Sequence, residues 1–190
     1  MGPRSKRDSE FAEFFEAHFA SACRYARALC GDASEGEELA QYAFVRMYAR
    51  WPKVRTETAA AYLRTTVTRL FLDTKRRGRA RERPVDELPE TPVEPRQPIV
   101  ERQPLQTALL GLPPRQRAVL LLRFGYDLPV DEVADALDCS TGTVKSQASR
   151  GLATLRSRYD EQNNELPDEA PGKEDRWPTT TTTSGRRCAS

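Results

Sequence analysis

The segment from residue 112 to 158 limits the possible folds of this chain more than any other part. Its apolar residues follow helical spacing, in two short helices that are joined by a tight turn and preceded by another helix. The apolar residues are Val133, Ala134 and Leu137 in the first helix of the pair and Val144 in the second. Residues 138–140 form the turn between the two helices. Asp138 stands where such turns often have glycine, and aspartate tolerates a left-handed backbone better than most residues. The pattern therefore predicts a compact helix pair with one buried aliphatic side.

The outward face of the second helix carries hydroxyl, amide and cationic groups, which suit the DNA major groove. Its residues are Thr143, Lys145, Ser146, Gln147, Ser149 and Arg150. Ser140 or Thr141 is expected to cap the helix, so that free backbone N–H groups face a phosphate. Gln147 suits a two-pronged contact with adenine, while Arg150 suits guanine or a phosphate. The alternative is a helical bundle whose polar face is only solvated.

Amphipathic helices are also predicted at the N-terminal side, in a first helical domain over residues 9–78. The first helix covers 9–30, a second follows it, and a third runs from about Thr58 to Arg77. Gly31, Pro52 and Gly78 are the expected helix ends, and Ser34 with Glu37 has the spacing of a capping box. The predicted core residues are Phe11, Phe14, Phe15, Ala22, Ala26, Leu29, Leu39, Ala43, Phe44, Met47, Tyr48, Trp51, Tyr62, Leu63, Val67, Leu70 and Phe71.

The rest of the chain divides into a linker, a second domain and a tail. Six prolines and interspersed charge predict an extended, mobile linker over 79–104. The second domain is expected over 105–159, with helices at about 105–111, 113–124, 129–137 and 141–158. The acidic composition from residue 160 to 190 predicts a disordered tail. The predicted fold class is all-α, with two small helical domains joined by a flexible linker.

Charge and cysteine usage narrow the function classes. The formal net charge is only +2, but residues 64–83 hold eight Lys and Arg against Asp73 and Glu82. Such a basic block favours binding to phosphates. The four cysteines form no CxxC pair and His18 is the only histidine, so we expect no metal site and no cofactor. With no apolar run that suits a signal peptide or membrane span, a reducing cytoplasm with free thiols is expected.

Region 4 of the bacterial sigma factors of the extracytoplasmic function (ECF) group resembles two stretches of this chain, LPPRQRAVLLLRFGYDLPVDEVADAL and STGTVKSQASRGLATLR. The likeness is to the actinobacterial SigE-like type within the sigma-70 family. In that family this domain binds the −35 promoter element and the β flap of RNA polymerase. The resemblance implies DNA contacts from Ser140, Thr141, Thr143, Lys145, Ser146, Gln147, Ser149 and Arg150. Family members often have arginine in place of Gln147, so promoter preference is expected to differ.

Region 2.2 of the same family, which docks on the β′ clamp helices of the polymerase, resembles the stretch DASEGEELAQYAFVRMYARW. The resemblance implies contacts with core polymerase from Glu38, Leu39, Gln41 and Phe44. Tyr42 departs from the family pattern, because an acidic residue is common there. Taken alone, the acidic residues at this helix start are equally explained by helix capping.

Regions 2.3 and 2.4 of the family, which open and recognise the −10 element, resemble the stretch AAAYLRTTVTRLFLDTKRR. The resemblance implies a base-binding loop from Arg55 to Ala59 and phosphate contacts from Arg64, Arg69, Arg76 and Arg77. Arg69 departs from the asparagine that many family members have. Cations that bind the backbone beside exposed bases fit single-stranded DNA. The alternative is a solvated basic helix end.

Together these features predict a sigma factor without catalysis of its own. Its expected partners are core RNA polymerase and promoter DNA, and an anti-sigma factor is a further candidate partner. A stand-alone helix-turn-helix regulator that binds duplex operator DNA is the alternative, and it would need a dimerisation or ligand domain. A nucleic-acid enzyme is disfavoured, since the chain has no Gly-rich phosphate loop, metal cluster or nucleophile–base pair. A pure protein-interaction module is the remaining alternative.

Overall fold

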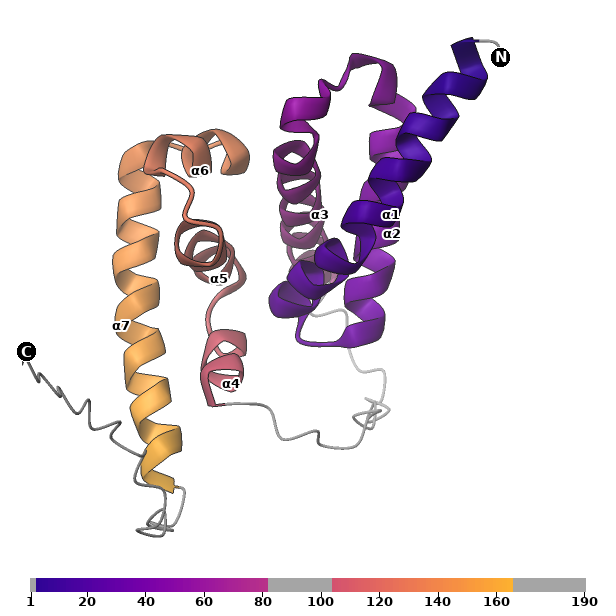
Figure 1. The fold of residues 1–190 in the computed structure, drawn as a ribbon. Coiled ribbons are helices and arrows are strands. Elements are labelled where there is room, and N and C mark those ends of the chain that lie inside the picture. Colours follow the sequence, from indigo (N-terminus) through magenta and orange to yellow (C-terminus); the bar gives the residue numbers. More distant parts are fainter. Residues whose placement is uncertain (1–2, 82–103, 166–190) are drawn as a thin grey trace, which may run out of the picture.

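The computed structural model describes residues 3–81 and 104–165, and every regular element within them is a helix. The first bundle consists of α1 (Pro3–Cys30), α2 (Ala33–Arg50) and α3 (Ala59–Arg81), with the short turns η1 (Trp51–Lys53) and η2 (Thr56–Thr58). The second bundle consists of α4 (Pro104–Leu110), α5 (Pro114–Leu120), the π-helical turn η3 (Leu121–Gly125), α6 (Val130–Leu137) and α7 (Thr141–Glu165). Figure 1 shows the two bundles side by side. The all-α prediction with two helical units is confirmed, while most of the predicted linker and tail lies outside the described residues.

The first bundle is held by aromatic packing of α1 against α2 and the turn η1. The rings of Phe14 and Trp51 lie 5.1 Å apart and those of Phe14 and Phe44 lie 6.1 Å apart. Most of the predicted core residues are buried. Tyr48 is an exception, because its side chain is 40 % exposed and its hydroxyl donates to Asp8 Oδ1 at 2.9 Å. The Tyr48 prediction was wrong because an amphipathic tyrosine at the edge of a helix stripe keeps its hydroxyl accessible.

Several helix ends differ from those predicted. Asp32, rather than Ser34, caps α2, since its Oδ1 accepts from the backbone N–H of Glu35 at 2.8 Å. The helix α3 continues through Gly78 to Arg81, because a single glycine costs a helix only about 1 kcal/mol. Gly31 has the predicted left-handed backbone, with φ of +90°.

The outer helices are also longer than predicted. The first helix begins at Pro3 rather than at residue 9, and α7 runs to Glu165 rather than to 158. The tail prediction is therefore wrong for residues 160–165, which hold neither proline nor glycine. The predicted helix over 113–124 is also interrupted, because its second half forms η3.

The helix pair at the heart of the second bundle has the predicted geometry. Asp138 ends α6 in the left-handed conformation, with φ of 51°, and the N–H of Cys139 donates to the carbonyl of Ala134 at 3.0 Å. This closure satisfies a carbonyl of the last helical turn. Ser140, and not Thr141, caps α7, since its Oγ accepts from the N–H of Thr143 at 3.1 Å. Val133, Leu137 and Val144 are buried as predicted.

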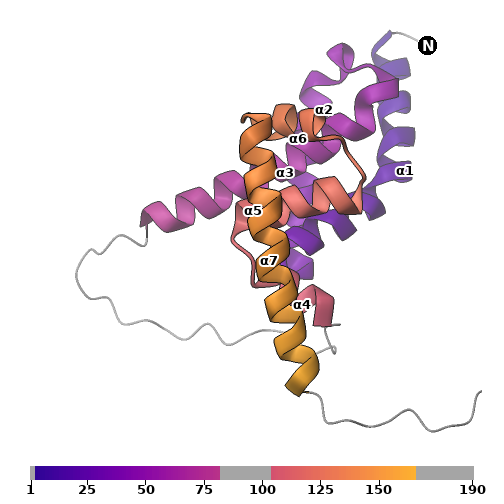
Figure 2. The ribbon, with the colours of Figure 1, turned by 90° about the vertical axis from the view of Figure 1, so that its left-hand side faces the viewer.

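The two bundles are in contact along a surface that we call the interdomain seam. In Figure 1, α3 lies on the side of the first bundle that faces the second, and Figure 2 shows α5 and α6 crossing over it. The seam consists of Tyr25, Leu29, Gly31, Arg64 and Arg69 from the first bundle and Leu110, Arg117, Tyr126, Asp135 and Ala136 from the second. No helix within the described ranges is long and apolar enough to cross a membrane.

Candidate nucleic-acid interface

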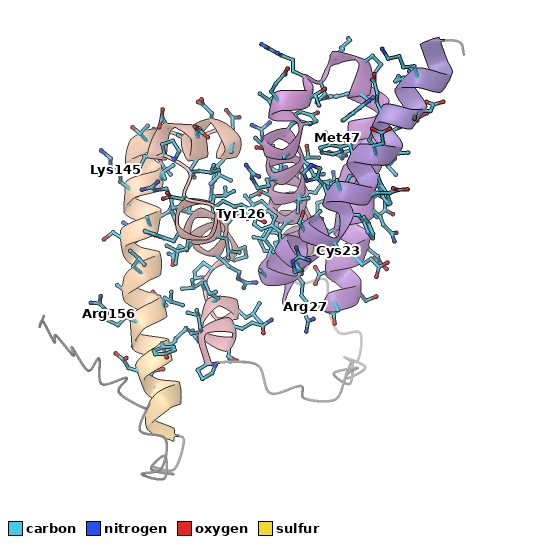
Figure 3. The ribbon with its side chains drawn as sticks, in the orientation of Figure 1. Cys23, Arg27, Met47, Tyr126, Lys145 and Arg156 are labelled. Atoms are coloured by element: carbon cyan, nitrogen blue, oxygen red, sulfur yellow. The ribbon has the colours of Figure 1, made fainter. Side chains whose placement is uncertain are left out.

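The outer face of α7 presents the polar side chains that the sequence assigns to DNA. Lys145, Ser146, Ser149 and Arg150 are exposed, and Gln147 is half-buried. Figure 3 shows Lys145 pointing away from the first bundle, on the same side of α7 as Arg156. The hydroxyls nearest the helix start have partners within the helix: Ser140 Oγ lies 2.9 Å from Thr143 Oγ1, and Ser146 Oγ donates to the carbonyl of Thr143 at 2.9 Å. The longer side chains farther along are therefore the ones positioned to reach a base or phosphate.

The helix-turn-helix geometry gives this face its orientation. The buried residues of α6 and α7 hold the pair together and leave the outer side of the N-terminal half of α7 exposed. Thr141 and Thr143 lie in its first turn, where the positive end of the helix dipole attracts a phosphate, and the N–H of Thr143 already donates to Ser140 Oγ. The arrangement fits insertion of the start of a recognition helix into the major groove.

The basic end of α3 is a second cationic surface. Arg76 and Arg77 are exposed, and Arg76 Nη2 lies 3.1 Å from Asp73 Oδ1. Lys75 instead forms an ion pair with Glu35 of α2 at 2.9 Å, within the first bundle. Exposed ion pairs of this kind contribute little to stability, so Arg76 remains available to a phosphate.

A surface cavity lies beside the predicted base-binding loop. Its volume is about 600 Å³, and its walls are formed by the end of α2, the turns η1 and η2, and the start of α3. The lining residues are Ala49, Arg50, Pro52, Lys53, Val54, Arg55, Thr58 and Tyr62. Arg55 is exposed at this site and lies 3.7 Å from Glu57. The structure thus places an aromatic ring and cations together around a hollow large enough to admit a nucleotide base.

Arg64 and Arg69 lie elsewhere, in the interdomain seam. The guanidinium of Arg64 lies over the ring of Tyr126, 4.8 Å from its centroid. Arg69 donates to the backbone carbonyls of Ala136 at 2.8 Å and Asp135 at 2.9 Å. Two of the five residues predicted to contact the −10 element are therefore covered by the second bundle.

The residues predicted to dock on core polymerase divide into an exposed and a buried pair. Glu38 and Gln41 lie on the surface of α2, whereas Leu39 and Phe44 are in the core with exposed fractions of 8 % and 3 %. The prediction of direct contact from Leu39 and Phe44 does not fit this structure, in which they support α2 from beneath.

Two further residues lie on the same exposed side of α2 as Glu38 and Gln41. Tyr42 is 66 % exposed and Val45 is 67 % exposed, which is unusual for large apolar side chains. The sequence carries a signal for this face, because residues 38, 41, 42 and 45 follow the i, i+3, i+4, i+7 spacing of one helix side. Sequence reasoning missed Val45 because the neighbouring apolar stripe accounted for the core.

The second bundle has an apolar groove of its own between α4 and the C-terminal half of α7. It is lined by Pro104, Leu105, Leu152, Leu155, Arg156, Tyr159 and Asp160, and its volume is about 640 Å³. Leu105, Leu152 and Tyr159 are substantially exposed there. This composition fits contact with an apolar protein surface rather than with DNA.

Comparison with known proteins identifies the family to which this chain is similar. The model for sigma-70 region 2 matches residues 14–81, and the model for sigma-70 region 4 matches residues 102–155. The chain is 35 % identical over 149 residues to the RNA polymerase sigma-E factor of Streptomyces coelicolor, which covers 77 % of this chain and 84 % of that protein. It is 30 % identical over 166 residues to the ECF RNA polymerase sigma factor SigE of Mycolicibacterium smegmatis, covering 83 % and 65 % of the two chains.

The chain belongs to the ECF group of the sigma-70 family. This sigma factor directs transcription initiation, and the family assignment decides against the stand-alone regulator. The fold is also similar to that of the sigma factor RpoE from Bartonella quintana, solved in complex with the anti-sigma factor NepR. That likeness has a TM-score of 0.61 at 20 % identity and covers 80 % of this sigma factor and 97 % of the solved chain.

Proposed function

We propose that this sigma factor recognises a promoter at two separate places, one for each bundle. The second bundle binds the duplex −35 element through α7, with Lys145 and Arg150 as the leading contacts and Gln147 as the residue that sets base preference. Thr143, Ser146 and Ser149 lie beside them, and Ser140 and Thr141 form the N-terminal phosphate site. The observation that carries this proposal is the outward cationic face of α7 on a closed helix-turn-helix.

The first bundle acts at the −10 element. Arg76 and Arg77 bind the backbone of the opened strand, and the cavity between η1 and Tyr62 accepts a flipped base beside Arg55. Arg64 and Arg69 extend this surface along α3 once the seam opens. Cations next to a hollow with an aromatic ring are the usual elements of single-strand recognition.

Core polymerase binds both bundles in this proposal. The β′ clamp helices meet α2 at Glu38, Gln41, Tyr42 and Val45, with Leu39 and Phe44 fixing the helix from the core. The β flap meets the apolar groove between α4 and α7. An anti-sigma factor of the kind bound to the Bartonella relative would compete for these same surfaces. The chain performs no catalysis itself and acts in the cytoplasm, where polymerase and promoter DNA meet.

The test is in-vitro transcription with purified core polymerase. Transcript start mapping after induced expression first supplies the target promoters, and the full chain is then assayed on one of them. We expect promoter-specific initiation that requires both the chain and the core enzyme. A chain that binds core polymerase but starts transcription at none of the mapped promoters would contradict the proposal.

A further inference from the structure

The apolar groove between α4 and α7 is an uncovered contact surface of the second bundle. Leu105 of α4 and Leu152 and Tyr159 of α7 line it and are substantially exposed. Figure 1 shows α4 beside the C-terminal half of α7, so the groove lies away from the start of α7 that carries the proposed DNA contacts. Exposed apolar side chains that gather in one hollow mark a binding surface, because their burial is favourable.

The chain that continues from α7 begins close to this groove. A helix rises 1.5 Å per residue, so Tyr159 lies about 9 Å along the axis from Glu165, the last residue of α7, and Leu152 lies about 20 Å from it. The twelve residues from Glu165 to Trp177 can span about 40 Å when extended. The segment that follows α7 is therefore long enough to return to every part of the groove.

The sequence of this C-terminal segment, residues 166–190, suits such a return. Its one aromatic residue is Trp177, and a tryptophan has much apolar surface to bury. Pro171 and Gly172 stand midway between Glu165 and Trp177, and a Pro-Gly pair is typical of a turn that directs the chain back. Pro178 favours an extended backbone at the preceding tryptophan. The groove, at about 640 Å³, has room for an indole ring.

The charges around Trp177 also match those of the groove. Glu174 and Asp175 precede the tryptophan in the sequence, and Arg156 lines the groove. Asp160 lines it as well, and Arg176 stands directly before the tryptophan. Exposed ion pairs add little affinity, but opposite charges select one orientation of a bound segment.

Covalent attachment removes the need for strong affinity. A short flexible connection gives the tethered segment an effective concentration of about 1 mM at the groove. A contact with a dissociation constant of about 0.3 mM for the separate peptide would then be occupied about three-quarters of the time. One buried tryptophan with weak charge pairing is therefore enough to fill the groove.

We propose that residues 166–178 fold back along α7 in the free sigma factor, with Trp177 in the apolar groove, and that polymerase must displace them. The displacement rests on the proposed function, because that assigns the groove to the β flap. The outer face of α7 and the exposed side of α2 are outside the groove. The C-terminal segment thus lowers affinity for polymerase without covering the surface proposed for the −35 duplex.

The first experiment measures the accessibility of Trp177 in the full chain by acrylamide quenching of fluorescence. Trp51 and Trp177 are the two tryptophans, so the same chain with Trp177→Phe supplies the Trp51 signal that is subtracted. A synthetic peptide of residues 166–190 gives the value for a freely accessible Trp177. With the groove three-quarters occupied, Trp177 in the full chain should be quenched about fourfold less strongly than in the peptide.

Groove variants test where Trp177 is bound. Leu152→Gln and Leu105→Gln make the groove polar from its two walls and should raise the quenching of Trp177 toward that of the peptide. Ala153→Gln is the matched control, because Ala153 is an exposed residue of α7 outside the groove, and it should match the wild type. Circular dichroism establishes that each variant is folded.

Three results of the quenching experiment would overturn the docking. The first is a Trp177 as accessible in the full chain as in the peptide. The second is a protection that neither groove variant reduces. The third is a protection that rises with chain concentration, which would place the segment of a second copy in the groove.

The second experiment measures the affinity of the full chain for core polymerase. Trp177→Ala frees the groove and should bind about fourfold more tightly than the wild type, whereas Thr181→Ala, beyond the docked segment, should bind as the wild type does. Unchanged binding by Trp177→Ala overturns the competition. Leu152→Gln added to Trp177→Ala tests the flap contact itself and should weaken binding. Unchanged binding by that double variant contradicts the flap assignment of the proposed function, whereas an accessible Trp177 contradicts only the docking.

Discussion

The outer face of α7 and the inner face of α3 both carry arginines assigned to promoter DNA, yet they differ in what surrounds them. Lys145 and Arg150 project into solvent, whereas Arg64 and Arg69 are held against the second bundle. A duplex can therefore meet α7 in the structure as it stands. An opened strand can meet all of α3 only after the seam separates. The comparison indicates that the two proposed DNA-binding surfaces of one sigma factor differ in accessibility as well as in sequence.

The largest effect on promoter binding is expected from substitutions on the exposed outer face of α7. Lys145→Ala combined with Arg150→Ala removes one phosphate contact and one base or phosphate contact, for a loss of about 2 kcal/mol or roughly thirtyfold in promoter binding. Binding of the polymerase holoenzyme to a mapped promoter, measured over a range of salt concentrations, checks this. The salt dependence should also become shallower.

Arg158→Ala is the control for that pair. Arg158 is an exposed cation of the same helix, farther along, and it does not line the apolar groove assigned to the β flap. Only the start of a recognition helix enters the groove, so this variant should bind nearly as the wild type does. Equal losses in both variants would mean that α7 attracts DNA only by general charge.

The next largest effect is expected on promoter opening, from substitutions in the part of α3 that the seam leaves exposed. Arg76→Ala combined with Arg77→Ala should slow formation of the open promoter complex by about tenfold, because two backbone contacts are lost. Permanganate footprinting of unpaired thymines measures that rate. Arg27→Ala, an exposed arginine of α1 that is not among the proposed DNA contacts, should leave the rate unchanged. A normal rate in the double variant would place the −10 contact elsewhere.

The difference between the two faces also explains what the sequence could predict. The face of α7 depends on local periodicity and on a turn whose chemistry is visible in Asp138 and Ser140, so sequence reasoning located it. The α3 arginines were located equally well, but their surroundings were not. Arg69 bonds to backbone carbonyls 66 and 67 residues away, and Arg117 bonds to one 88 residues away. Every residue has a carbonyl, so such contacts leave no pattern in the partner's sequence.

Buried and exposed members of one motif were not separated either. The family motif on α2 predicts four residues that contact polymerase. Two of them, Leu39 and Phe44, are placed in the core by the packing of α1. Tyr42 and Val45 carry the exposed apolar surface instead. The length of α3 was also underestimated. A glycine such as Gly78 ends a helix only when the residues after it form a C-terminal cap, and here the helix continues to Arg81.

Arg69 bonds to α6 across the interdomain seam and also belongs to the proposed −10 surface, so its removal should have a smaller effect. Arg69→Ala loses a DNA contact but also releases α6, and the two changes offset each other to about a threefold loss in initiation. In the Tyr126→Ala background the seam is already open, so the same substitution should cost about tenfold. Run-off transcription with limiting sigma factor measures all four members of this double-mutant cycle. Strict additivity of the two substitutions would show that Arg69 does not take part in closure.

The smallest effect is a change in the reactivity of Cys30. This thiol lies between Leu29, whose carbonyl accepts from Arg117, and Gly31, against which Leu110 packs. Burial raises the pKa of Cys30 to about 12, so little thiolate forms at pH 8 and alkylation should be slow. Opening the seam in Tyr126→Ala reduces that burial, which lowers the pKa and should increase the alkylation rate by about two- to threefold. Iodoacetamide labelling followed by mass spectrometry measures the rate, with Cys139 of the second bundle as the internal reference. A rate that rises equally at Cys139 would indicate general loosening of the fold, whereas a rise confined to Cys30 would locate the change at the end of α1, where the two bundles meet.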